Sequence, residues 1–149
     1  MPPVSFETYP EARYCAAMSQ ENVESDKRGF ELWNCGDMDA LRERYHPEAV
    51  MHHPPAWPEP GPSVGRDAIF DQFRRLREDT QTNELQVTLL GDPDDWVIWE
   101  YLWSATGLES GLALELIGVQ AVRHSGGKVV EVRYYTDRGE AFEAFGLRE

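Results

Sequence analysis

Glu115 is the one acidic residue within residues 112–123, one of two long apolar stretches in the chain. Residues 96–106 (WVIWEYLWSAT) and 112–123 (LALELIGVQAVR) have strand-like compositions, and a turn containing Gly and Ser separates them, so they predict a β-hairpin. With the turn centred near Glu109, Glu115 pairs with Trp103. Strand alternation then predicts one shared face for these two residues and for Trp99, Tyr101, Ile117 and Val119.

An aromatic face of this kind suits the wall of a ligand pocket. A carboxyl group surrounded by indoles loses hydration, which disfavours its charged form and suits it to acid/base catalysis near neutral pH. We therefore predict Glu115 as a catalytic acid or base and the Tyr101 hydroxyl as a donor. The alternative is that Glu115 hydrogen-bonds a buried group, or reaches the pocket mouth, and only shapes the site.

The histidines do not predict a metal site. His52 and His53 are adjacent in a predicted short strand over residues 49–52, so their side chains point to opposite faces and cannot bind one ion together. His46 and the two cysteines, Cys15 and Cys35, do not complete a convergent set of ligands. We expect neither a metal nor a cofactor.

Three further aromatic residues are candidates for the pocket. Trp57 lies in a loop with prolines at positions 54, 55, 58, 60 and 62, and it either closes over a ligand or anchors the loop to the core. Tyr134 shares its parity with Val132, so its hydroxyl is expected to face the cavity. Phe30, on the apolar stripe of the first helix, is expected to line the pocket from the opposite side.

The order of the predicted elements indicates an α+β fold. Ser19 is a good N-cap for a helix ending near residue 34, Gly36 suits a left-handed helix stop, and Asp37 can cap a second, short helix. A third helix follows the proline loop, and strands are then expected over residues 85–90, 96–106, 112–123 and 128–136. A short helix over residues 138–145 ends the chain. Helices first and a mostly antiparallel sheet afterwards are typical of this class.

Length and charge restrict the function classes. A chain of 149 residues fits one domain, which we place at residues 18–149 behind an N-terminal extension at residues 1–17. The net charge of -13 disfavours binding to nucleic acid or to anionic lipid surfaces. No run reaches the length of a membrane span, and two cysteines are most simply read as reduced thiols, so we expect a cytoplasmic protein.

Four segments in sequence order resemble one family. They are WNCGDMDALRERYHPEAV, WPEPGPSVGRDAI, LESGLALEL and GGKVVEVRYYTDRGEAFEAFGL, and the resemblance covers about residues 18–148. The chain is similar to the SnoaL-like branch of the nuclear transport factor 2 (NTF2-like) superfamily, whose members include proteins like ketosteroid isomerases, polyketide cyclases, epoxide hydrolases and dehydratases. The resemblance implies a cone, in which a curved, mixed, mostly antiparallel sheet wraps three N-terminal helices around a cavity.

The residues that steroid isomerase chemistry requires are not matched at the corresponding positions of this chain. The position of that enzyme's oxyanion-hole tyrosine falls on Gly29, the position of its base near His53, and that of its second oxyanion acid near Val119. Glycine and valine side chains cannot donate a hydrogen bond. Only His53 remains as an assisting base, and its alternative role is to cap the proline loop.

The other face of the predicted hairpin suggests self-association. It would carry Leu102, Leu112, Leu114 and Leu116 with no helix left to cover them, which predicts a homodimer through the sheet. Our leading functional prediction is an acid/base lyase, isomerase, hydrolase or cyclase that acts on a small apolar cyclic substrate. One alternative is a non-catalytic dimer that binds a hydrophobic ligand, and another is a structural dimer whose cavity is filled by its own tryptophans.

Overall fold

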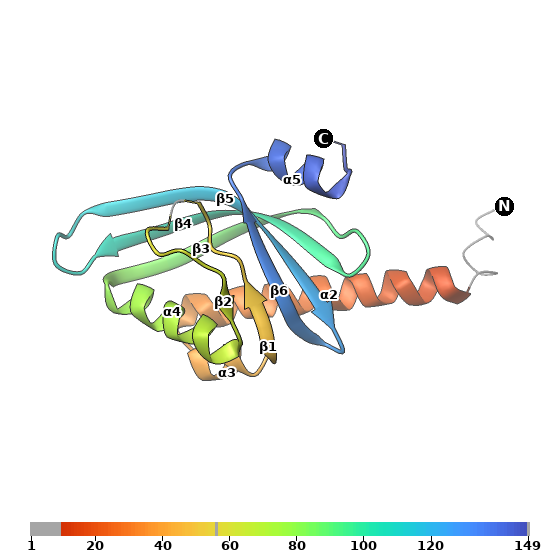
Figure 1. Cartoon of the computed structure of the whole chain (residues 1–149), viewed down its shortest axis with the longest axis horizontal. Coiled ribbons are helices and arrows are strands. Elements are labelled where there is room, and N and C mark those ends of the chain that lie inside the picture. Colours follow the sequence, from red (N-terminus) through yellow and green to blue (C-terminus); the bar gives the residue numbers. More distant parts are fainter. Residues whose placement is uncertain (1–9, 56, 149) are drawn as a thin grey trace.

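A curved sheet with helices on both faces makes up the protein (Figure 1). The computed structural model describes residues 10–55 and 57–148 of the chain. In these ranges the helices are α2 (Pro10–Cys35), α3 (Met38–Arg42), α4 (Arg66–Glu78) and α5 (Arg138–Phe145). The strands are β1 (Tyr45–Met51), β2 (Ser63–Val64), β3 (Thr80–Gly91), β4 (Trp96–Gly107), β5 (Ala113–Ser125) and β6 (Lys128–Tyr135).

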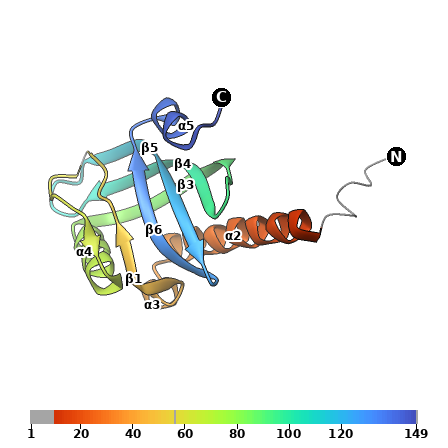
Figure 2. The ribbon, with the colours of Figure 1, turned by 45° about the vertical axis from the view of Figure 1, so that its right-hand side comes forward.

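The six strands form one mixed sheet in the order β2-β1-β6-β5-β4-β3. The β1–β6 pair is parallel and the other pairs are antiparallel. Figures 1 and 2 show α2, α3 and α4 on the concave side of this sheet and α5 on the convex side. The α+β class is confirmed, although α4 follows β1 and β2 and does not belong to a block of three N-terminal helices.

The first helix begins earlier than the sequence pattern predicted. The expected N-cap at Ser19 is wrong, because α2 starts at Pro10. Proline is tolerated in a first helical turn, and the residues that follow it include alanines at positions 12, 16 and 17, which are strong helix formers. Residues 10–17 of the predicted extension are therefore helical, and residues 1–9 lie outside the described part. The N-terminal turns of α2 project beyond the sheet (Figure 2).

The end of α2 agrees with the prediction. Gly36 has φ of 82°, and the N–H of Asp37 donates to the Leu32 carbonyl at 3.0 Å, which closes the helix with a left-handed residue. The Asp37 side chain then accepts a hydrogen bond from the Ala40 N–H at 3.1 Å and caps α3. This tight connection holds the α2–α3 pair against the concave face of the sheet.

The β4–β5 register differs from the predicted register by one residue. Trp103 pairs with Leu116, and Glu115 pairs with Ser104. The connection, residues 108–112, contains Gly111 with φ of 67° and is centred later than Glu109. Because side chains alternate with a period of two, a shift of one residue moves every β5 side chain to the other face. Leu114, Leu116 and Gln120 therefore share the concave side with Trp103, whereas Glu115, Ile117 and Val119 lie on the convex side.

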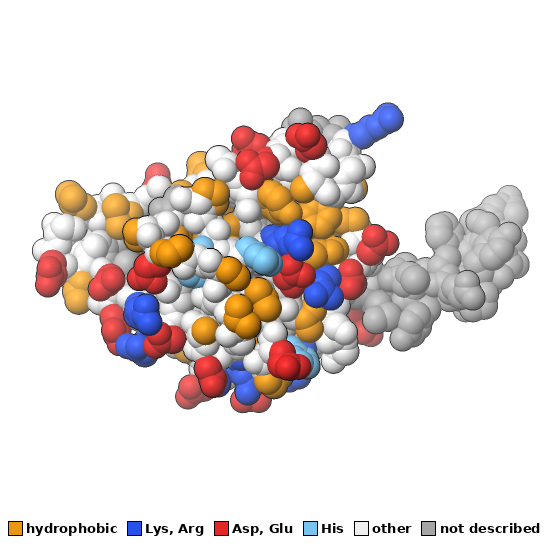
Figure 3. All heavy atoms as spheres, viewed as in Figure 1, with side chains coloured by type: hydrophobic (Ala, Val, Ile, Leu, Met, Phe, Trp, Pro, Cys, Tyr) orange, Lys and Arg blue, Asp and Glu red, His pale blue; other side chains and the backbone are white. Residues whose placement is uncertain are grey.

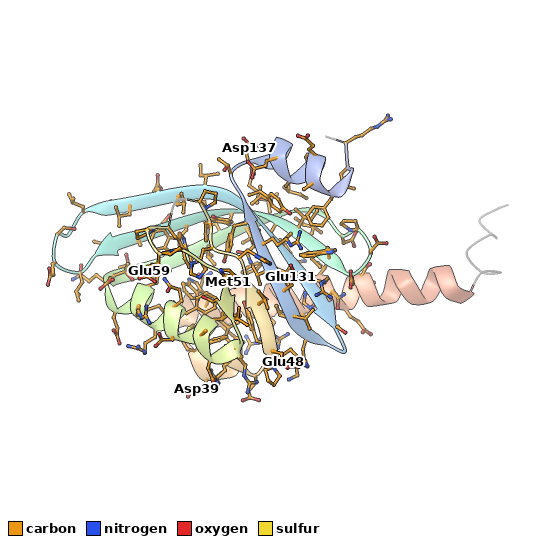
Figure 4. The ribbon with its side chains drawn as sticks, in the orientation of Figure 1. Asp39, Glu48, Met51, Glu59, Glu131 and Asp137 are labelled. Atoms are coloured by element: carbon orange, nitrogen blue, oxygen red, sulfur yellow. The ribbon has the colours of Figure 1, made fainter. Side chains whose placement is uncertain are left out.

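The convex face is partly covered, contrary to prediction. Ala141 of α5 packs against Ile98, Val119 and Ala121, and all four are buried. Phe145 adds an edge-to-face contact with Trp96, at 5.2 Å between ring centroids. The main core lies on the other side of the sheet, where Met51 is fully buried (Figure 4). Within residues 10–55 and 57–148, no helix is long and apolar enough to cross a membrane.

Two glycine substitutions should shift stability in opposite directions. Gly36→Ala should lower the free energy of unfolding by about 1 kcal/mol, because an L-residue is strained at positive φ. Gly139→Ala, in α5 at ordinary helical φ, should leave stability unchanged or raise it by about 0.5 kcal/mol. Urea unfolding of both variants measures the difference, and equal effects would contradict the role assigned to the Gly36 stop.

Candidate functional site

A cavity of about 450 Å³ lies between the concave face of the sheet and helices α2 and α4. This volume is within the range of small-molecule sites. Most of its wall is apolar and aromatic, with contributions from helices, strands and the proline-rich loop. The aromatic residues that line it include Phe30, Trp33, Trp57, Phe73, Tyr101, Trp103 and Tyr134.

The cavity has a closed end and an open end. Residues 118–122 of β5 are buried, whereas four of residues 113–117 are exposed, so the cavity opens toward the β4–β5 turn. Glu59 of the proline-rich loop and Arg75 of α4 line this open end and form an ion pair at 3.5 Å. Figure 4 shows Glu59 over α4 on this side of the molecule.

Asn83 of β3 orients two of the wall tryptophans. Its Oδ1 atom accepts hydrogen bonds from the indole N–H groups of Trp33, at 2.8 Å, and of Trp103, at 2.7 Å. With both N–H groups satisfied in this way, the rings contribute apolar surface to the cavity. A flat ring compound is the kind of ligand that such surfaces favour.

The buried carboxylate on the cavity wall is Asp26 of α2, with 6% of the residue exposed. Its Oδ2 atom accepts from the Trp99 indole N–H at 2.8 Å, and its Oδ1 atom lies 2.8 Å from His124 Nε2. An ionised carboxylate can only accept, so Nε2–H of His124 is the donor. Each carboxylate oxygen retains a lone pair that a ligand can use.

Sequence reasoning missed both Asp26 and His124. The signal was present, because Asp26 interrupts the apolar stripe of α2 at the helical spacing of Val23, Phe30 and Trp33. A polar residue inside a buried stripe requires a partner from elsewhere in the fold. That partner, His124, is 3% exposed, and its Nδ1 atom has no hydrogen-bond partner among the described residues.

Three tyrosines supply hydroxyl groups that stay protonated at neutral pH. Burial raises the pKa of Tyr101 to about 12. Burial, followed by the negative charge of Asp26, raises the pKa of Tyr45. Burial, followed by the neighbouring Tyr45 and Tyr101, raises the pKa of Tyr134 well above its usual value. All three line the cavity and can act as neutral hydrogen-bond donors.

Tyr101 reaches across the neighbouring strand. A methyl group at Gly118 of β5 would lie 2.6 Å from the Tyr101 hydroxyl oxygen, so the ring occupies the space that a side chain at this position would need. The same ring meets Tyr134 edge to face, at 6.0 Å between centroids. Gly118 is thus required for its small size, and it allows the Tyr101 hydroxyl to approach β5.

The prediction that His53 is a base in the pocket is wrong in its geometry. His53 Nδ1 lies 3.0 Å from the Glu59 carbonyl, and Nε2 lies 2.6 Å from Ser63 Oγ, so both ring nitrogens are engaged within the loop region. A side chain at Gly61 would collide with the ring at 2.7 Å. His53 does not line the cavity. Its alternative role, capping the proline-rich loop, is the arrangement observed.

The other predicted pocket residues divide into two groups. Phe30, Trp57, Tyr101, Trp103 and Tyr134 line the cavity. The corrected register moves Ile117 and Val119 to the convex face, and Trp99 is 2% exposed in the core, where its N–H supports Asp26.

Glu115 does not lie among the indoles as predicted. It borders the open end of the cavity with an exposed side chain, on the opposite face of β5 from Leu116. Within the described residues, no group of three or more His, Cys, Asp or Glu side chains could hold a metal ion.

Comparison with known proteins agrees with the architecture. Residues 27–132 match the family of SnoaL-like domains. Among solved structures, Bal32a from a soil-derived mobile gene cassette is 28% identical, with a TM-score of 0.73 over 86% of this chain and 98% of that one. No curated protein matches the chain.

Two further structures share the fold at lower identity. An NTF2-like protein of unknown function from Burkholderia pseudomallei is 16% identical, with a TM-score of 0.68 over 83% of this chain and 95% of that one. TerC, crystallised with polyporic acid, is 18% identical, with a TM-score of 0.67 over 83% of this chain and 96% of that one.

The contact between Tyr101 and Gly118 can be tested by a double-mutant cycle. Gly118→Ala should lower the free energy of unfolding by about 1 to 3 kcal/mol, because the new methyl group displaces the Tyr101 ring. In a Tyr101→Leu background the same substitution should cost much less, and urea unfolding of the four proteins gives the coupling. The same cost in both backgrounds would show that Gly118 does not serve to accommodate the Tyr101 ring.

Proposed function

The chain belongs to the family of SnoaL-like domains, and on this premise we propose that it binds a small, flat, apolar ring compound and acts on it by acid/base chemistry. Asp26 is the base, in place of Glu115 and His53. The hydroxyls of Tyr45, Tyr101 and Tyr134 are the donors. The reaction class is proton transfer at carbon, as in an isomerase, lyase or cyclase.

The observation that carries this proposal is the buried Asp26 carboxylate on the wall of an aromatic cavity. Two hydrogen bonds, from Trp99 and His124, hold the carboxylate in place, and each of its oxygens retains a lone pair on a side chain that lines the cavity. The carboxylate removes a proton from a ligand carbon next to a carbonyl, and the C–H electrons move onto the carbonyl oxygen. A tyrosine hydroxyl stabilises the resulting oxyanion by a hydrogen bond. Return of the proton to another atom completes the reaction without an oxidant.

Asp26→Asn should remove the chemistry and retain the binding. 2-Tetralone is a suitable probe, because it is a flat cyclic ketone with acidic hydrogens beside its carbonyl. In D2O the wild type should accelerate deuterium incorporation into these positions, and Asp26→Asn should reduce the rate about 100-fold or more, because an amide cannot accept the proton. Mass spectrometry measures the exchange, and isothermal titration should show nearly unchanged affinity.

Glu84→Gln provides a matched control, because it removes an exposed carboxylate from β3. It should leave both the rate of deuterium exchange and the affinity for 2-tetralone unchanged. Binding of 2-tetralone by the wild type without accelerated exchange would contradict catalysis by Asp26. That result would support the alternative function, in which the same cavity holds a hydrophobic ligand without turnover. Polyporic acid, the compound crystallised with TerC, is a second probe for that case.

We also propose that two copies associate through the convex face of the sheet. Leu102 and Ile117 are cross-strand partners there, and Ile117 is 65% exposed. Leu108 and Leu112, at the turn of the same hairpin, are 55% and 65% exposed. Figure 3 shows apolar side chains at this end of the molecule. α5 covers the centre of the face, so the proposed contact lies toward the hairpin end.

Ile117→Lys should dissociate this dimer. Light scattering at tens of micromolar should give the wild type about twice the mass of the 17.1 kDa chain and should give the variant the monomer mass, because a charge replaces the central apolar contact. Val64→Lys is the matched control, since Val64 is 69% exposed on β2 at the far edge of the sheet. A monomeric wild type would contradict the proposal.

A further inference from the structure

Gln120 of β5 is a polar residue on the cavity wall that takes no part in the proposed acid/base chemistry. It is 8% exposed and lines the cavity. Its cross-strand neighbours are Trp99 on β4 and Tyr134 on β6. Its side-chain amide makes no hydrogen bond to any other residue in the described part of the chain, and it is not among the fully buried unpaired groups there. The amide, with two donors and one acceptor, is therefore accessible from the cavity.

The accessible amide of Gln120 is available to a ligand in the cavity. An amide that faces a cavity is hydrated when the cavity is empty, and a ligand that displaces this water must replace its hydrogen bonds. The cross-strand neighbours of Gln120 do not supply the partner. The Trp99 N–H donates to Asp26, and the Tyr134 hydroxyl has a weak acceptor, Met51 Sδ, at 4.0 Å. Gln120 and Tyr134 are cross-strand neighbours that both line the cavity, so an amide and a weakly bonded hydroxyl are close to each other on its wall.

We infer that Gln120 is a specificity residue that binds the carbonyl oxygen of a neutral ring ligand. The inference rests on the proposed function and adds the class of ligand and its orientation. Donors from Gln120 and Tyr134 require an acceptor, which a carbonyl oxygen provides. The carboxylate of Asp26 on the same cavity wall repels an anionic group, so the ligand carries a ketone, quinone or lactone carbonyl and not a carboxylate.

The shape of the cavity then sets the direction of the ligand. Gln120 and Asp26 are in the closed part, whereas Trp103 and Leu116 form the wall toward the open end. A ligand with its carbonyl at Gln120 places its apolar rings against Trp103 and Leu116. The carbonyl end of the ligand therefore enters first. The Gln120 amide and the Tyr134 hydroxyl find a hydrogen-bond partner only when that end carries an acceptor.

A pair of isosteric probes tests this assignment. 2-Tetralone has a carbonyl where 2-methylenetetralin has an exocyclic CH2 group, so the two differ mainly in the acceptor. By isothermal titration the wild type should bind the ketone roughly tenfold more tightly than the alkene, because the alkene leaves the amide unpaired. Gln120→Leu should bring the ratio close to one by weakening ketone binding and strengthening alkene binding.

Gln86→Leu is the matched control, because Gln86 is exposed on β3 and faces away from the cavity. It should keep the wild-type ratio. Gln120→Glu retains the size and polarity of the side chain but replaces donors with an acceptor, and it should also lose the preference for the ketone. Thermal melting of each variant verifies that it is folded.

The outcomes separate this inference from the proposed function. Equal affinities of the wild type for both probes, or a preserved preference in Gln120→Leu, would overturn the role of Gln120 and leave Asp26 catalysis standing. Asp26→Asn should lose deuterium exchange yet retain the preference for the ketone. Failure of the wild type to bind either probe would overturn the proposed function, and the assignment of Gln120 with it.

Discussion

The arrangement of the site depends on the two hydrogen bonds that the buried Asp26 carboxylate accepts. The carboxylate joins α2 to two central strands, because it accepts one hydrogen bond from Trp99 of β4 and one from His124 of β5. A buried charge without such partners would cost several kcal/mol, so the helix can lie at this depth only when the sheet presents both donors. The contact that holds α2 against the sheet therefore also positions the carboxylate that we propose as the base.

Side-chain hydrogen bonds between a helix and a strand also hold the cavity walls on the side of β3. Asn83 on the edge strand satisfies two indole N–H groups with one oxygen atom, and Asn34 of α2 exchanges two hydrogen bonds with the Leu85 backbone, at 2.9 and 2.7 Å. Helix and edge strand are thus joined by side-chain amides, and within residues 10–55 and 57–148 no further strand pairs with β3 on that side. The polar groups lie behind the aromatic surfaces, and a ligand meets mostly apolar walls.

The sequence was sufficient for features set by local chemistry. Gly36 and Asp37 ended one helix and capped the next as expected, since a left-handed glycine and a capping carboxylate act within a few residues. The four long strands β3 to β6 and their order along the chain also followed from residue patterns, whereas β2 was not predicted and β1 begins earlier than expected. The site was less predictable, because the face on which Glu115 lies depends on the turn at residues 108–112, where one residue decides the register. Asp26 and His124 are 98 residues apart, and no local pattern joins them.

The length of the turn between β4 and β5 determines which side chains of β5 face the cavity. Leu114 and Leu116 face inward, while Glu115 and Ile117 face outward, solely because of the length of residues 108–112. Insertion or deletion of one residue in this exposed turn would exchange the inner and outer side chains of the distal part of β5, with no substitution in the strand itself. The length of this turn thus determines which side chains of β5 face the cavity and which face outward.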